Sequence, residues 1–137
     1  MLNFVSITNP INLQYTEMME RFLMNTVAFS VALVTKDYST FSQEVRDIMA
    51  ADENWLKDSV EWSQSLLVLS LVDGENYQTA DDVAGDLSTL LALYNIATQR
   101  ELTDREDALF VRLHDRFLAL LLTDEKLIEY LLEEQDE

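Results

Sequence analysis

The sequence of 137 residues has no cysteine, one proline, two glycines and one histidine. Without cysteine there can be no disulfide, no thiolate zinc site and no cysteine nucleophile. Proline and glycine are too few for a β protein rich in turns. A single histidine excludes zinc or iron sites built from several imidazoles. These absences favour a helical protein with few residues suited to catalysis.

The sequence also offers no arrangement typical of an active site. His114 has only apolar neighbours one helical turn away on either side, so we expect it to pack beside the core, with Asp115 or a distant loop as its remaining partners. Gly74 and Gly85 stand alone, which excludes a glycine-rich phosphate loop, and Gly85 is expected to mark close helix packing. We therefore expect a protein that is not an enzyme and that needs no cofactor and no metal.

Long hydrophobic runs are missing as well. No apolar stretch approaches the ~18 residues that a membrane-spanning helix requires. The N-terminus, Met1-Leu2-Asn3-Phe4, lacks the basic residues that begin a signal peptide. We expect a soluble cytoplasmic protein, in the host cytoplasm if a phage encodes it, with no contact to a membrane.

The chain does contain apolar residues at helical spacing along most of its length. The spacing predicts six helices, over about residues 10–36, 41–49, 52–73, 79–96, 103–122 and 123–132, after a short extended N-terminal segment. We expect an all-α, single-domain bundle spanning residues 1–137, in which residues 133–137 fit a frayed acidic tail. The expected helix 52–73 is the most apolar, so we place it at the centre of the bundle.

Capping residues mark the expected helix starts. Thr103 with Glu106 has the form of a capping box, Thr79 is a looser example, and Thr123 is expected to cap the last helix. Asn9-Pro10 is typical of the start of the first helix, and the polar pair Asn25-Thr26 is where we expect that helix to bend.

The expected central helix carries Trp55, Ser59, Trp62, Leu66 and Leu69 along one face. A neighbouring row widens this face into a broad side that we expect to be buried: Leu56, Val60, Ser63, Leu67 and Leu71. Helical aromatic stripes are mostly buried, so we expect Trp55 and Trp62 to pack in the core. The alternative is that these two side chains form an exposed binding anchor.

The net charge is the most unusual property of the sequence. The chain has 26 acidic and 9 basic residues, a net charge of -17, whereas a magnitude of about 2 to 8 suffices for a small domain. That sign disfavours direct binding to nucleic acid and to anionic membranes, and it favours a basic partner. Residues 1–36 contribute no net charge, so the acidic surface must come from the remaining residues.

Carboxylates recur at i, i+3 or i+4 in several expected helices, although such like-charge pairs destabilise a helix by roughly 0.2 to 0.5 kcal/mol each. A sequence that breaks a local rule repeatedly indicates a functional surface, although a solvated helix face explains each row by itself. We predict an acidic partner-binding face composed of Glu44, Asp47, Asp52, Glu53, Asp58, Glu61, Asp82, Asp86, Glu125, Glu129 and Glu133.

Our leading hypothesis is a non-enzymatic inhibitor that mimics nucleic acid and occupies the basic, DNA- or RNA-binding surface of a partner protein. Seventeen carboxylates in one stripe would match the charge on about 29 Å of duplex DNA. By class alone, the chain looks like the small acidic helical inhibitors that phages use against restriction or CRISPR systems.

Two alternatives remain open. The first is a helical assembly chaperone or homo-oligomeric structural subunit that uses the uncharged first helix as its interface. The second is a metal-assisted hydrolase built on the clustered carboxylates.

Overall fold

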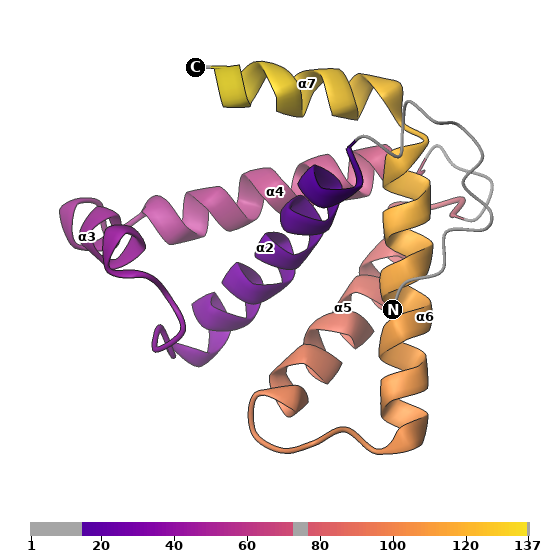
Figure 1. Cartoon of the computed structure of the whole chain (residues 1–137), viewed down its shortest axis with the longest axis horizontal. Coiled ribbons are helices and arrows are strands. Elements are labelled where there is room, and N and C mark those ends of the chain that lie inside the picture. The colour runs from indigo at the N-terminus through magenta and orange to yellow at the C-terminus, as the bar shows by residue number, and fades with distance from the viewer. Residues whose placement is uncertain (1–14, 73–76, 137) are drawn as a thin grey trace.

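Residues 15–72 and 77–136, the part of the chain that the computed structural model describes, form six α-helices and no strand. The helices are α2 (Thr16–Thr35), α3 (Gln43–Ala51), α4 (Trp55–Val72), α5 (Ala80–Ala97), α6 (Asp104–Leu122) and α7 (Glu125–Asp136) (Figure 1). This confirms the prediction of an all-α bundle. The expected N-terminal extended segment, the Asn9-Pro10 helix start and the expected end of the central helix at residue 73 lie outside the described residues.

Local capping explains where several helices begin. Thr103 accepts a hydrogen bond from the Glu106 N–H, and the Glu106 carboxylate accepts one from the Thr103 N–H, which completes the capping box predicted for α6. The Thr79 hydroxyl caps α5 through the Asp82 N–H, as predicted. The prediction for α7 was wrong by one residue, because Asp124 rather than Thr123 accepts the free N–H, that of Leu127.

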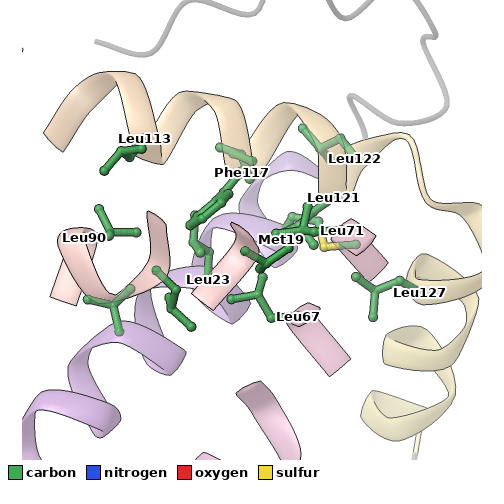
Figure 2. Packing of buried hydrophobic residues seen from close by; sticks show 14 of the residues in the cluster. Met19, Leu23, Leu67, Leu71, Leu90, Leu113, Phe117, Leu121, Leu122 and Leu127 are labelled. Carbon is green, nitrogen blue, oxygen red and sulfur yellow. The ribbon is translucent and has the colours of Figure 1, made fainter. Parts of the chain in front are cut away.

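α4 lies at the centre of the bundle together with α2, because the two helices pack against each other and each also packs against α5 and α6. Met19, Leu23 and Val27 of α2 are completely buried. All three belong to one cluster with leucines of the other helices and the Phe117 ring of α6. Figure 2 shows Met19 and Leu23 within this cluster. The first described helix is therefore mainly a core element.

A buried polar seam joins α2 to α4. The Thr26 hydroxyl donates to the Phe22 carbonyl and is hydrogen bonded to the Ser63 hydroxyl, and Gln64 donates to Ser30 beside them. Because Thr26 and Ser63 satisfy each other, neither hydroxyl is left unpaired in the core. The pair Asn25-Thr26 lies within one continuous helix, and its threonine serves the contact with α4.

α4 buries only part of the broad side that the sequence indicated. Its buried side chains are Leu56, Val60, Ser63, Leu67 and Leu71, which point to α2, α5 and α6. On the neighbouring face, Trp62 is 43% exposed and Leu69 is 66% exposed. The expectation of a core position was therefore wrong for Trp62, whereas Trp55 is half-buried against the Phe29 ring of α2. Two apolar stripes overlap on this helix, and only one of them faces the core.

Gly85 of α5 does not mark close helix packing, contrary to expectation. A Cβ atom placed on Gly85 meets nothing within 4 Å. The residue lies on an exposed side of the helix, so neither a neighbouring helix nor a crowded backbone accounts for it.

Candidate interaction surface

Six of the predicted partner-binding carboxylates lie on α3, on the first half of α4 and in the turn between these helices. All six side chains are exposed: Glu44, Asp47, Asp52, Glu53, Asp58 and Glu61. Asp47 accepts a hydrogen bond from Gln43, and Asp52 accepts one from the Asn54 N–H. Within the described parts of the chain, none of the six forms an ion pair.

The cations on these segments do not neutralise them. Arg46 of α3 directs its guanidinium to the carbonyl oxygens of Tyr38 and Ser39, at 3.1 and 3.0 Å. Lys57 of α4 is exposed. The carboxylates therefore exceed the cations on this end of the molecule, and they face solvent.

Three further predicted carboxylates, Glu125, Glu129 and Glu133, are exposed on α7. Two contacts set the direction of this helix: Ser70 near the end of α4 donates to Asp124 at 2.6 Å, and the Trp62 indole N–H donates to the Tyr130 hydroxyl at 3.3 Å. α7 therefore runs antiparallel to α4, and its C-terminal half lies beside the acidic first half of α4 (Figure 1). We call these nine residues of α3, the α3–α4 turn, α4 and α7 the acidic surface.

The remaining two predicted residues, Asp82 and Asp86, belong to a different region. They lie on α5, which Figure 1 shows on the other side of α4 from α7. Asp86 accepts a hydrogen bond from the Tyr77 hydroxyl at 2.6 Å and lies 3.6 Å from the Arg116 guanidinium of α6. Burial, together with the hydrogen bond to Asp86, raises the pKa of the Tyr77 hydroxyl well above its usual range. Asp86 is thus a structural contact that holds α5 to α6, and it does not join the acidic surface.

An open groove runs between α4 and α7, next to the acidic surface. Its volume is about 650 Å³, and its lining includes Leu66 and Leu69 of α4 and Leu127 and Tyr130 of α7. The Trp62 and Tyr130 rings, 6.2 Å apart between centroids, span the two helices at one end. Sequence reasoning missed this groove, because it predicted that the exposed stripe of α4 would be covered.

His114 of α6 is buried and contacts Asp115, both as expected, but it also has an acidic neighbour on another helix that the sequence did not reveal. Its Nε2 lies 2.8 Å from an oxygen of Glu20 on α2, and its Nδ1 lies 3.2 Å from Asp115. This Glu20 oxygen is buried, and within the described part of the chain it has no hydrogen-bond partner. No local pattern pointed to Glu20, because the contact joins two helices far apart in the sequence. The arrangement ties α6 to α2.

Two features of the described residues bear on the other hypotheses. Among them, no three histidine, aspartate or glutamate side chains gather in a way that could hold a metal ion. Across residues 15–72 and 77–136, every helix is too short or too polar to cross a membrane.

The fold and this surface define a small all-α protein with an excess of exposed carboxylates. The chain belongs to the DUF3206 family, described as proteins of unknown function, whose model matches residues 4–131. A comparison with curated proteins gives no match.

Proposed function

We propose that this protein is a non-catalytic interaction protein, and that its acidic surface binds a basic surface of a partner protein. The single observation that carries the proposal is the placement of charge. Nine exposed carboxylates lie on α3, the α3–α4 turn, α4 and α7, where the only cations among described residues are Arg46, Lys57 and Lys126. Like charges are costly to hold together, and a cationic partner relieves that cost.

The partner surface we favour is one that itself binds nucleic acid. Such surfaces are rich in Lys and Arg, and they attract any dense array of negative charge. Less the charges of Arg46, Lys57 and Lys126, the nine carboxylates leave six negative charges. Six charges match about 10 Å of duplex DNA, roughly a third of the span that the whole net charge suggested. An inhibitor that occupies the nucleic-acid site of a restriction or CRISPR enzyme is the form of this function that the charge pattern favours.

The alternative of an assembly chaperone or homo-oligomeric subunit that uses the first helix has lost its main support. Met19, Leu23 and Val27 of α2 are completely buried within the chain itself. A partner could reach them only if the core opened, and that would cost several kcal/mol.

The test is displacement of DNA from its binding proteins. A panel of purified DNA-binding proteins, each holding a fluorescent duplex, is titrated with this protein, and release of the duplex is followed by fluorescence anisotropy. We expect release from at least one member at 50 mM NaCl and much weaker release at 200 mM NaCl, because salt screens the charges.

Two matched variants test whether DNA displacement depends on where the carboxylates lie or only on how many there are. The first neutralises four residues of the acidic surface: Glu44→Gln, Asp47→Asn, Glu129→Gln and Glu133→Gln. The second neutralises four exposed carboxylates elsewhere: Asp81→Asn, Asp82→Asn, Glu101→Gln and Asp107→Asn. Only the first is expected to lose displacement, by at least tenfold. Equal losses in the two variants would contradict the proposal.

A further inference from the structure

Several large apolar side chains in and beside the groove between α4 and α7 are exposed to solvent. Leu69 is 66% exposed, Trp62 43% and Tyr130 38%. These are three of the six large hydrophobic side chains that are exposed among the described residues, and they lie in or beside one groove. Apolar surface concentrated in this way marks a site for a partner, whereas single exposed leucines do not.

Carboxylates flank the same groove. Asp58 lies one helical turn before Trp62, and Glu133 lies one turn after Tyr130, so each shares a helix face with an aromatic ring of the groove. Glu125 lines the other end, beside Lys126, which is the only cation in the lining. An occupant with apolar side chains toward the groove and cations on its edges complements both features.

We propose that the α4–α7 groove binds an amphipathic helix of the partner protein, with leucine-like side chains against Leu69 and Trp62 and with Lys or Arg residues facing Asp58 and Glu133. This inference rests on the proposed function and adds that the partner binds through an amphipathic helix. On α4 the lining of the groove begins at Leu66, and the Trp62–Tyr130 ring pair extends the exposed apolar surface beyond it. Trp62 and Ser70 are about 12 Å apart along the helix axis, which is roughly two turns. A helix laid into such a groove contacts it through residues at i, i+3 or i+4, and i+7.

Charge argues against the other occupants. A second copy of this chain would bring one net charge of -17 against another, and long-range repulsion opposes that association. Nucleic acid is disfavoured by the same sign. A basic helix is attracted by the acidic surface and gains apolar contact in the groove.

The experiment uses the full chain and three fluorescein-labelled peptides of 18 residues. The first is an amphipathic helix of leucine and lysine. The second keeps the leucines and replaces lysine by glutamate, and the third keeps the lysines and replaces leucine by serine. Binding is measured by fluorescence anisotropy at 50 and 200 mM NaCl. We expect the leucine–lysine peptide to bind at least tenfold more tightly than either of the others.

Leu69→Asp is the decisive variant, and Val34→Asp is its matched control, because Val34 is 81% exposed on α2, away from the groove. Each adds one negative charge, so attraction between charges alone would strengthen the binding of a basic peptide to both. We expect Leu69→Asp to weaken binding of the leucine–lysine peptide at least tenfold and Val34→Asp to change it less than twofold. If Leu69→Asp lowers the melting temperature by more than a few degrees, Leu69→Gln takes its place.

Each other outcome overturns the inference in a different way. If the serine–lysine peptide binds as well as the leucine–lysine peptide and Leu69→Asp has no effect, the acidic surface binds cations without the groove, and the proposed function survives. If no lysine peptide binds at 50 mM NaCl, the proposed function fails as well. Equal binding of the leucine–glutamate peptide overturns the basic character of the occupant.

The remaining occupants have their own signatures, and either one overturns the inference. A dimer in sedimentation equilibrium that Leu69→Asp dissolves identifies a second copy as the occupant. A rise of tenfold in peptide affinity when Phe4→Ser and Ile7→Ser are introduced together identifies the N-terminal segment of the chain itself.

Discussion

The same substitution at two leucines is expected to change the free energy of unfolding by different amounts in the core and in the groove. Leu23 of α2 is completely buried, whereas Leu69 of α4 is 66% exposed. Leu23→Ala removes buried atoms and leaves a cavity, at a cost of about 2.7 to 5 kcal/mol in the free energy of unfolding. Full burial of a leucine contributes about 1.5 to 3 kcal/mol. Only about a third of Leu69 is covered, so Leu69→Ala costs at most about 0.5 to 1 kcal/mol.

The two variants are compared with the native chain by urea denaturation, followed by far-UV circular dichroism. The expected difference between them is about 2 kcal/mol or more, with unchanged m values. In thermal unfolding it corresponds to a gap of roughly 6 to 10 °C for a chain of this size. If Leu69→Ala costs as much as Leu23→Ala, Leu69 is covered in solution, and the reasoning that the groove is open is wrong.

Three other predictions concern the fold. Thr26→Val leaves the Ser63 hydroxyl without its partner in the core and is expected to cost about 1 to 3 kcal/mol in urea denaturation. Adding Ser63→Ala to it is expected to recover part of that loss, and a further loss would contradict the reasoning. Gly85→Ala is expected to stabilise α5 by about 0.5 to 1 kcal/mol in thermal unfolding, because the added Cβ meets nothing within 4 Å and alanine restricts the unfolded chain. Arg100 and the Thr103 N–H lower the pKa of Glu106 from its usual 4.5 to about 2. The charge of Glu106 therefore stabilises the fold fully above pH 4.5, and this contribution is lost as the pH falls toward 2. Glu106→Gln is therefore expected to be less stable than the native chain at pH 7 and equal to it near pH 2, and a difference independent of pH in urea denaturation would refute this.

The sequence allowed prediction of features that depend on neighbouring residues. The caps of α5 and α6 follow from Thr79, Thr103 and Glu106, because a capping hydrogen bond joins residues three apart. The start of α7 was harder to predict, since Thr123 and Asp124 both carry an oxygen that can cap, and the fold uses Asp124.

Features that depend on contacts between helices could not be predicted in the same way. Trp62 and Leu67 lie on two apolar stripes of α4, and only the packing of α2, α5 and α6 decides which stripe is buried. Asp86 resembled its neighbours in the sequence, but Arg116 and Tyr77 bind it. The pairing of Thr26 with Ser63 likewise joins two helices, so a pattern within either helix could not indicate it.

The central claim is that the acidic surface of α3, α4 and α7 binds a basic protein. The most direct measurement is the dissociation constant between this protein and a DNA-binding protein whose duplex it displaces, determined by calorimetry from 50 to 200 mM NaCl. We predict that the affinity falls at least tenfold over that range, and that neutralising four carboxylates of the acidic surface removes most of the salt dependence. An affinity that is independent of salt, or a panel from which no duplex is displaced, would contradict the account.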